Sequence, residues 1–486
     1  MDPRMTTIAT KLRNVGYHTV AIGKWHAGMS TMAHVPGSRG FDRSLGYLAG
    51  SEDHFTHRGS GIRCRLSSGQ SDGGQAANIT GRNRSTGSGG KNTTLFDMYD
   101  TLAPVLDTQE RFGQVYNGDI FGRLAVATVN NHSAFYGANS SRRAASPPLQ
   151  PPPQDRQPLF VYLAFANAHH PMEVPPEWLE LYPNTTTTTR QTYQAMVSFV
   201  DVAIGNLTAA VKAVEGMWEN SIVVVCSDNG GPSLTDLDTS NNYPLRGGKY
   251  SLFEGGMRVT SFVSGGVIPA AMRGKVSNVL AHTVDFYATF AHLAGAPIAD
   301  TAAAVHAGAR GVNGGPGGVP PVDSANLWPI LSGATDAGPR AELPLSIGPP
   351  GKNGCSDGSS DFADNGGALI VGAFKLIVGK SCPAHWTGPD SPNGTASVGL
   401  MHDCGSSGCL YNLLDDPTEH FDLALSGAKT NATLAAILAM LQKRMVALNR
   451  TVFQTAYDAS PITDAECSTP QMQAMLKAGV WSPWQQ

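Results

Sequence analysis

Asp228 and Asn229, in the cluster Ser227-Asp228-Asn229-Gly230-Gly231, offer a carboxylate and an amide oxygen. Both are ligands that a hard divalent cation takes, and the glycines that follow let the backbone turn tightly. A calcium ion needs about six to eight oxygen ligands. Further donors must therefore come from other parts of the protein.

Cationic and proton-donating side chains occur in three further clusters. These are Gly23-Lys24-Trp25-His26, Asn167-Ala168-His169-His170-Pro171 and Arg246-Gly247-Gly248-Lys249. Beside a bound metal, Lys24, His26, His169 and Lys249 would bind a tetrahedral oxyanion and stabilise the charge that develops during transfer. Taken singly, each histidine is also typical of a hydrogen-bonded structural residue, and Lys249 of a solvated loop lysine. Together they favour a site for sulfuryl or phosphoryl transfer.

Three of these clusters directly follow short apolar runs, at 17–22, 159–166 and 222–226. Such runs, without polar alternation, are typical of strands buried on both faces of a parallel sheet. Between the second and third runs lies a helical stripe, ended by Gly216 and formed by Tyr193, Met196, Val197, Val200, Ile204, Leu207 and Val211. A strand-helix-strand crossover makes the two strands parallel, so their carboxyl ends share one edge of the sheet. The clusters are therefore expected to meet there.

Composition and charge exclude several classes of protein. The 486 residues are 41% hydrophobic, enough for a sizeable core, and the net charge is −4. No overall basic balance steers the chain toward nucleic acid or anionic lipid. The longest apolar stretch spans about ten residues, whereas a membrane helix needs about 20. We therefore expect no nucleic-acid partner and no membrane span.

Other features indicate the secretory pathway, so we expect a secreted or lysosomal protein. Charged residues make up only 15% of the chain. N-x-S/T sequons occur at Asn78, Asn83, Asn92, Asn131, Asn139, Asn184, Asn206, Asn393, Asn431 and Asn449. We expect no signal peptide in this chain, because Met5, Ile8, Leu12 and Val15 already have helical spacing.

The seven cysteines are few and odd in number. Cys404 and Cys409 are close enough in sequence for a local disulfide, and Cys355 and Cys382 could close a loop. Cys226 lies in an apolar run, which favours a buried thiol.

Segments rich in Gly, Ser, Pro, Asn or Ala predict surface insertions near 57–91, 139–157, 298–321 and 349–366. In the last third, 369–371 with 374–378 predicts a hairpin, 410–414 another strand and 433–448 a helix with an apolar face. We therefore predict an α/β domain over 1–342 and a smaller α+β domain over 343–486.

These motifs, in this order, resemble those of the sulfatases of the alkaline-phosphatase superfamily, most closely the arylsulfatase B (N-acetylgalactosamine-4-sulfatase) type. The likeness also includes Arg39-Gly40-Phe41-Asp42, Gly50-Ser51-Glu52-Asp53, Glu254-Gly255-Gly256 and Gly479-Val480-Trp481-Ser482-Pro483-Trp484. It implies an alkaline-phosphatase-like fold, with a mostly parallel central sheet flanked by helices and a C-terminal antiparallel sheet plus helix. It also implies a calcium ion and a sulfated carbohydrate or aryl sulfate as substrate.

The resemblance assigns roles where positions match. Asp228 and Asn229 would be calcium ligands, and Lys24 and Lys249 would hold the sulfate. His169 would contact the ester or protonate the leaving alcohol, and His26 would help to break down the sulfated intermediate. Cys467 resembles a cysteine that anchors the tail, and its partner is expected outside this chain.

The family's nucleophile motif is absent from this chain. Members use formylglycine made from Cys or Ser in C/S-x-P-x-R, and a pair of consecutive aspartates near the start of their chains completes their metal site. Neither feature is present, and both would precede residue 23, so we expect an N-terminally truncated sulfatase. The alternatives are an impaired fragment or pseudoenzyme that binds sulfated glycans and, less favoured by the lysines, a phosphoester hydrolase. The oligomeric state stays open.

Overall fold

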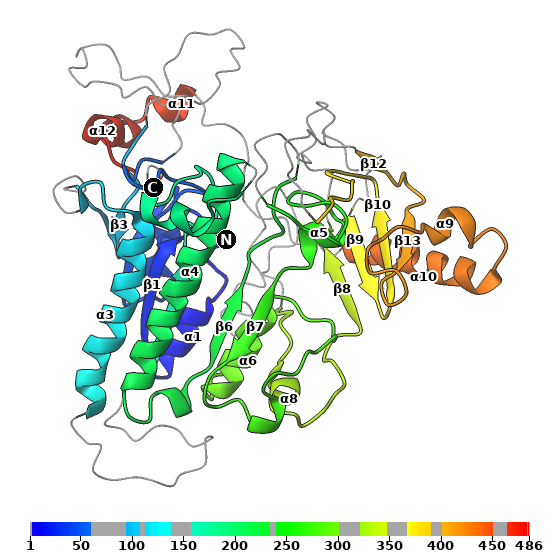
Figure 1. Cartoon of the computed structure of the whole chain (residues 1–486), viewed down its shortest axis with the longest axis horizontal. Helices are drawn as coiled ribbons and strands as arrows, with labels where there is room; N and C mark the ends of the chain where they lie inside the picture. The colour runs from blue at the N-terminus through cyan, green and yellow to red at the C-terminus, as the bar shows by residue number, and fades with distance from the viewer. Residues whose placement is uncertain are drawn as a thin grey trace.

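The computed structural model describes residues 2–59, 94–106, 112–137, 157–185, 187–233, 240–300, 321–347, 367–389, 401–450, 464–483 and 485. The largest sheet of the described residues has five strands in the order β4-β3-β2-β1-β5. Figure 1 labels β1 and β3 of this sheet. β1 (His18–Lys24) pairs in parallel with β2 (Arg43–Tyr47) and β5 (Leu159–Ala164). The short strands β3 (Tyr99–Asp100) and β4 (Ala103–Pro104) add an antiparallel edge. The sheet is therefore mixed, with a parallel centre.

Helices cover both faces of this sheet, as the alternation of side chains along β1 requires. Val20 and Ile22 lie in a cluster with Phe121 of α3 (Asn117–Gly137), and Leu207 of α4 (Thr188–Ala213) packs against it. Ala21, on the other face, lies in a cluster with Ala9 of α1 (Ile8–Asn14). α6 (Asp285–Leu293) lies on this second face, where its Phe290 contacts Phe160 of β5. The predicted α/β layering is present.

α4 matches the predicted helical stripe and is capped by Thr187, whose hydroxyl accepts the Arg190 N–H. By length and composition it is the one helix of the described chain that could cross a membrane. It packs against α3, and core helices of soluble proteins pass the same test.

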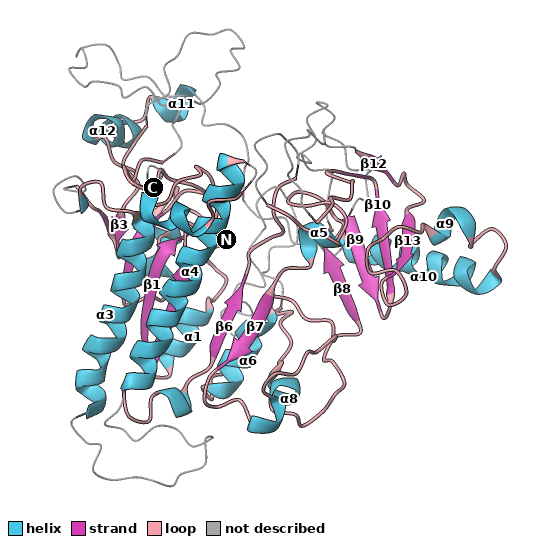
Figure 2. Ribbon diagram, in the orientation of Figure 1, coloured by secondary structure: helices cyan, strands magenta, loops and turns pink. Residues whose placement is uncertain are grey.

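β6 (Val223–Cys226) does not join the five-stranded sheet within the described residues. It pairs antiparallel with β7 (Ser261–Ser264) in a two-stranded sheet, which Figure 2 shows as two adjacent magenta arrows. The prediction that the runs at 159–166 and 222–226 form one parallel sheet is therefore wrong here. An apolar run indicates a buried strand but does not specify its hydrogen-bonding partner.

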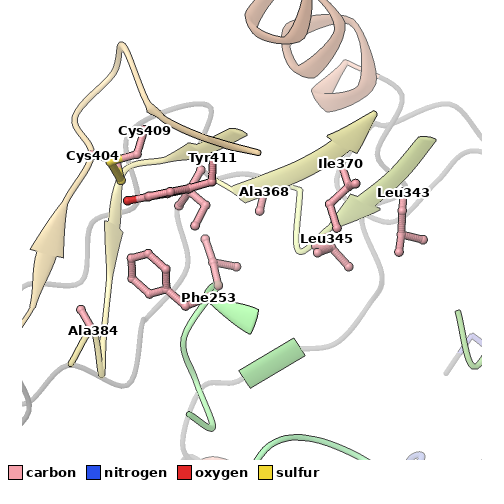
Figure 3. Close-up of a cluster of buried hydrophobic side chains, with 11 residues drawn as sticks. Phe253, Leu343, Leu345, Ala368, Ile370, Ala384, Cys404, Cys409 and Tyr411 are labelled. Atoms are coloured by element: carbon pink, nitrogen blue, oxygen red, sulfur yellow. A yellow bond between two sulfur atoms is a disulfide. The ribbon is translucent and has the colours of Figure 1, made fainter. Parts of the chain in front are cut away.

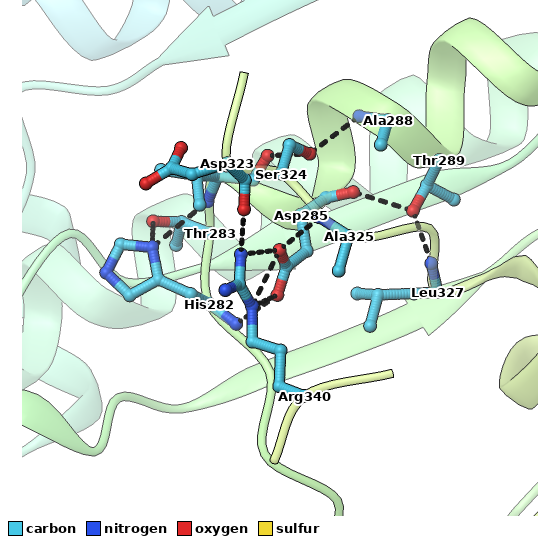
Figure 4. A network of polar contacts seen from close by, with 11 residues as sticks. His282, Thr283, Asp285, Ala288, Thr289, Asp323, Ser324, Ala325, Leu327 and Arg340 are labelled. Atoms are coloured by element: carbon cyan, nitrogen blue, oxygen red, sulfur yellow. Dashed lines mark hydrogen bonds and ion pairs between the residues drawn. The ribbon is translucent and has the colours of Figure 1, made fainter. Parts of the chain in front are cut away.

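A buried carboxylate fastens the segment after residue 320 to α6 (Figure 4). Asp285 is fully buried and accepts hydrogen bonds from the His282 and Ala325 N–H groups and from the Arg340 guanidinium. Burial raises the pKa of Asp285, but the hydrogen bonds from Arg340 and the two backbone N–H groups outweigh it and keep this pKa below its usual value. The ion pair thus fixes the α6 end of the second face.

The C-terminal part contains the predicted hairpin and helix. Its antiparallel sheet has the order β13-β10-β9-β8, formed by β8 (Glu342–Leu345), β9 (Gly367–Val371), β10 (Phe374–Val378) and β13 (Cys409–Asn412). One face packs on α10 (Ala432–Asn449) through Leu441 and Met445. The other face packs on Phe253 of the larger part (Figure 3). The domain boundary at 342/343 stays a prediction.

The remaining elements are short. The helices are α5 (Glu254–Met257), α8 (Trp328–Leu331), α9 (Leu423–Ser426), α11 (Asp464–Cys467) and α12 (Pro470–Ala478), and one further strand pair joins β11 (Lys380–Ser381) to β12 (His402–Asp403). Short 3₁₀ helices occur at Met32–His34, Pro36–Arg39, Pro176–Leu181, Trp218–Asn220 and Ala270–Met272. α12 packs on Leu95, so the chain end returns to the larger part.

The cysteines agree with the sequence only in part. The predicted Cys404–Cys409 disulfide is present. Cys467 is disulfide-bonded, as is Cys382, so the expectation that the partner of Cys467 lies outside this chain is wrong. Cys226 is free but half-buried rather than buried, because β6 has no second neighbouring strand among the described residues.

The predicted insertions lie largely outside the described residues. The first begins later than predicted, because His57 is buried and Gly59 and Arg58 form bridges to Glu52 and Phe96.

Candidate active site

The predicted site residues lie at the carboxyl ends of β1 and β6 and in three loops. Lys24 is the last residue of β1, His169 follows β5 and Asp228 follows β6. Burial lowers the pKa of Lys24, the nearby Lys249 charge lowers it further, and the Asp228 carboxylate partly offsets both. Segments distant in sequence thus bring two ammonium groups and one carboxylate within electrostatic range of each other.

Two glycines allow the strand ends to approach so closely. Gly23 has a φ of 93°, and a Cβ there would lie 1.9 Å from the Ala164 carbonyl oxygen. A Cβ on Gly46 would lie 1.8 Å from the Gly23 carbonyl oxygen. Any larger residue would push β2, β1 and β5 apart just before Lys24.

His169 and Lys249 are in direct contact. The Lys249 Nζ lies 3.2 Å from His169 Nε2, while His169 Nδ1 lies 3.0 Å from the His170 carbonyl oxygen. Because a carbonyl oxygen only accepts, the Nδ1 atom carries the proton, and Nε2 accepts a hydrogen bond from the ammonium group. Burial lowers the pKa of His169 despite the His170 hydrogen bond, and the charges of Lys249 and Lys24 add to this lowering. These surroundings therefore favour the neutral form of the ring.

His26 faces the same groups from the end of β1. Burial lowers the pKa of His26, and the charges of Lys24 and Lys249 add to this effect, against the attraction of Asp228. Its backbone N–H donates to the Leu48 carbonyl oxygen, and its ring lies directly over Gly50, where a Cβ would be 2.9 Å from Nε2. The His26 ring can therefore occupy this position only because residue 50 has no side chain.

Close backbone packing positions the Lys249 loop. The Lys249 N–H donates to the Gly231 carbonyl oxygen, three residues after Asp228. The Asn242 side chain accepts the Gly231 N–H and donates to the Gly231 and Gly247 carbonyl oxygens. A Cβ on Gly248 would lie 2.4 Å from the Gly231 oxygen. The glycines of the two motifs therefore let the Lys249 loop pack closely against the loop that carries Asp228.

Arg246 has a structural environment. Its guanidinium lies between the rings of Phe253 and Trp386, at 3.9 Å and 4.3 Å from their centroids. It also donates to the Ala384 carbonyl oxygen and to the Tyr411 hydroxyl. Arg246 thus joins the start of the Lys249 loop to the C-terminal sheet.

A second structural tie starts from Glu254, for which the sequence indicated only a family-like motif. Glu254 lies beside the buried Lys375, which also pairs with Glu419. The Lys375–Glu254 ion pair connects α5 to the C-terminal sheet.

Asp228 and Asn229 fit a calcium ion in donor type but not in number. Asp228 is exposed, and no hydrogen bond to its carboxylate is present within the described residues. Asn229 Nδ2 donates to the Gly230 carbonyl oxygen, so Asn229 Oδ1 can accept. Two oxygens are far fewer than the six to eight that calcium takes. The described chain therefore holds part of such a metal site.

Sequence reasoning missed the group that holds His169. The ring of buried His54 donates from Nε2 to the His169 carbonyl oxygen, at 3.1 Å, and its Nδ1 lies 3.0 Å from Asn117 Oδ1. Asn117 also donates to Glu52, where burial raises the pKa well above its usual value. These residues come from the loop after β2 and the start of α3. Only the motif around Glu52 gave a signal of their importance.

Asp97 holds the segment below His26. It is fully buried and accepts the Leu48 and Ala49 N–H groups at 2.9 Å and 2.8 Å. Burial raises the pKa of Asp97 to about 6, against the effect of these two hydrogen bonds. Nothing in the sequence around Asp97 indicates this role.

This chain is similar in sequence to known proteins. A model of the sulfatase family matches residues 2–296. Mouse arylsulfatase J is 26% identical over 98% of this chain and 66% of its own length. Human arylsulfatase A is 25% identical over 60% of this chain and 49% of its own length. The chain thus spans less than two thirds of the length of these curated relatives.

Solved structures confirm the predicted fold class. Ps i-CgsB in complex with k-i-k-neocarrahexaose has a TM-score of 0.60 at 22% identity, over 97% of this chain and 80% of that chain. The PsFucS1 sulfatase from Pseudoalteromonas sp. has a TM-score of 0.51 at 17% identity, over 90% and 74%. These likenesses show an alkaline-phosphatase-like α/β fold. Together with the family match over most of the larger part, they establish that the chain belongs to the sulfatase family.

Proposed function

We propose that this site is the sulfate-binding part of the active site of a sulfuric ester hydrolase. The observation that carries the proposal is the Lys249–His169 contact at 3.2 Å beside Lys24 and Asp228. Two ammonium groups around a neutral imidazole favour a tetrahedral anion, because charge-assisted hydrogen bonds to oxyanions are among the strongest in proteins. A sulfate monoester matches this charge, and the family match supports the same chemistry.

The residues would divide the work as follows. Lys24 and Lys249 would hold the sulfate oxygens and stabilise the charge that develops on them. His169, released from Lys249 by the entering anion, would contact the ester oxygen through Nε2. Once Nε2 has taken up a proton from solvent, the ring would donate that proton to the leaving alcohol. His26 lies near Lys24, Lys249 and Asp228. In the presence of the family's nucleophile it would help to break down the sulfated intermediate.

Calcium would bind at Asp228 and Asn229. When bound, a divalent cation supplies charge that polarises the sulfate group. The roles proposed for Lys24, Lys249, His26 and His169 do not depend on where this ion lies. Loss of sulfate affinity on removal of divalent cations by a chelator would support the assignment.

The substrate that we propose is a sulfated carbohydrate or an aryl sulfate. One structural relative was solved with a neocarrahexaose, and a sequence relative is named an arylsulfatase. The likeness to the N-acetylgalactosamine-4-sulfatase type favours a 4-sulfated amino sugar. The sequons and low charge favour a glycoprotein of the secretory pathway, secreted or lysosomal.

The printed chain has no C/S-x-P-x-R motif. We therefore expect it to bind sulfate esters with little or no turnover, because no residue of that motif can accept the sulfuryl group. This favours a binding protein as the second candidate function. Vigorous hydrolysis of 4-nitrophenyl sulfate by this chain in the presence of calcium would contradict that expectation.

Calorimetric titration with inorganic sulfate tests the proposed site. Lys249→Met should weaken sulfate binding by about tenfold to a hundredfold, the range of one charge-assisted hydrogen bond. Lys212→Met is the matched control, because Lys212 lies on α4 against Trp218, before the amino end of β6. It should leave the affinity unchanged. Equal affinities for Lys249→Met and the unchanged chain would refute the proposal.

A further inference from the structure

The turn that carries Lys249 contains a residue in an unfavourable backbone conformation. The Ser251 N–H donates to the Gly248 carbonyl oxygen at 2.9 Å, which closes a four-residue turn. Tyr250, at the third position, has a φ of 80°. Turns with positive φ at this position strongly favour glycine or asparagine. A tyrosine in this conformation has a backbone energy cost, and such costs are typical of residues at functional sites.

Burial of the ring does not compensate for this cost. Tyr250 is 57% exposed, whereas Gly248 and Ser251, the two ends of the turn, are buried. The turn is also firmly anchored, because the Ser251 hydroxyl accepts the Gly248 N–H and the Lys249 N–H is bonded to Gly231. A rigid base therefore projects a large aromatic ring toward solvent.

The ring stands beside the proposed anion site. The Lys249 Nζ lies 5.6 Å from the centroid of the Tyr250 ring and 3.2 Å from His169 Nε2. The ammonium group is thus bordered by the aromatic ring and by the imidazole. A sulfate bound to Lys249 would place the organic part of its ester within reach of the ring.

We infer that Tyr250 is a specificity-determining residue whose ring packs against the sugar or aryl ring that bears the sulfate. This inference rests on the proposed function and extends it to the organic part of the substrate. Ligand sites combine a few polar groups that fix orientation with aromatic surfaces that bind the apolar part. The face of a six-membered ring offers such an apolar surface, and aromatic packing adds to its burial. The positive φ at this position is thus retained because it aims the ring at the ligand.

Three variants separate the ring from the backbone strain. Tyr250→Gly and Tyr250→Ala both remove the ring, but only glycine adopts the positive φ without strain. Tyr250→Phe keeps the ring. Each variant is titrated with N-acetylgalactosamine 4-sulfate and with inorganic sulfate, and its melting temperature is measured.

Loss of the Tyr250 ring should weaken the binding of the sulfated sugar but not the binding of inorganic sulfate. Tyr250→Gly and Tyr250→Ala should bind the sulfated sugar about three- to tenfold more weakly, the effect of one aromatic contact. Tyr250→Phe should bind it like the unchanged chain, and inorganic sulfate should bind all four proteins equally. The melting temperature should rise for Tyr250→Gly and not for Tyr250→Ala.

Undiminished binding of the sulfated sugar by Tyr250→Gly would overturn the inference while leaving the sulfate site intact. Equal losses for the sugar and for inorganic sulfate would also overturn it, because the residue would then only shape the Lys249 turn. Failure of the unchanged chain to bind inorganic sulfate would instead overturn the proposed function itself.

Discussion

Replacing Lys375 by methionine should strongly destabilise the protein. Its ammonium group is fully buried, 2.8 Å from Glu254 Oε1 and 2.9 Å from Glu419 Oε1. Without it, two nearly buried carboxylates face each other with no positive charge between them. Breaking a buried ion pair in this way costs about 3–5 kcal/mol of unfolding free energy.

The pH dependence of this variant follows from Glu419. Burial raises the pKa of Glu419, and the Lys375 charge partly offsets this effect. Removing Lys375 leaves the burial uncompensated, so the folded variant holds a proton that the unfolded chain has already released above its usual pKa. The loss of stability should therefore be largest at pH 8 and smaller near pH 5.

Urea unfolding followed by tryptophan fluorescence measures the effect. The triple variant Glu254→Gln, Lys375→Met, Glu419→Gln is the matched control, because it removes all three charges and should recover most of the lost stability. Lys375→Met should also weaken sulfate binding, since α5 packs under the Lys249 loop through Gly255, whose N–H donates to the Arg246 carbonyl oxygen. A single variant as stable as the unchanged chain at pH 8 would refute this account of the cluster.

Two further substitutions probe the loops around the site. Gly50→Ala should displace the His26 ring, because the new Cβ would lie 2.9 Å from its Cε1 and Nε2 atoms. We expect a loss of about 1–3 kcal/mol of unfolding free energy, weaker sulfate binding by calorimetry and shifted imidazole resonances. Unshifted imidazole resonances would contradict this expectation. Glu173→Gln addresses a carboxyl whose pKa is raised from 4.5 to about 7, chiefly by burial and then by Asp53. The folded chain keeps this proton between those pH values while the unfolded chain has lost it, so ionised Glu173 lowers stability as the pH rises. The melting temperature of Glu173→Gln relative to the unchanged chain should therefore increase from pH 5 to pH 8, and a constant difference would refute the assignment.

Local pattern was enough to predict the elements that present the site. The apolar runs at 17–22, 159–166 and 222–226 correspond to β1, β5 and β6, and the stripe between the last two corresponds to α4. Such short-range signals work because a buried strand is a short run of apolar residues, and a buried helix face is a set of apolar residues three or four positions apart. The hairpin of β9 and β10 was predictable for the same reason.

Long-range pairing was not predictable. The strand that pairs with β6 is β7. The composition of the run at 222–226 does not specify this partner, because strand pairing depends on how the chain between the strands folds. Lys375 meets Glu254 across 121 residues of sequence, and His54 meets the His169 carbonyl across 115. Nor does a single tyrosine in a glycine-rich motif reveal a positive φ. These features arise only when the packed chain brings the residues together.

The central claim is that Lys24, Lys249, His26 and His169 surround one anion. Nuclear magnetic resonance titration of the two imidazoles, with and without inorganic sulfate, tests it most directly. Burial first, and then the charges of the two lysines, lower both pKa values in the free chain. A bound sulfate should raise the pKa of both histidines, and the Lys24→Met, Lys249→Met double variant should lose this response. Histidine pKa values that ignore sulfate, or that respond equally in the double variant, would contradict the claim.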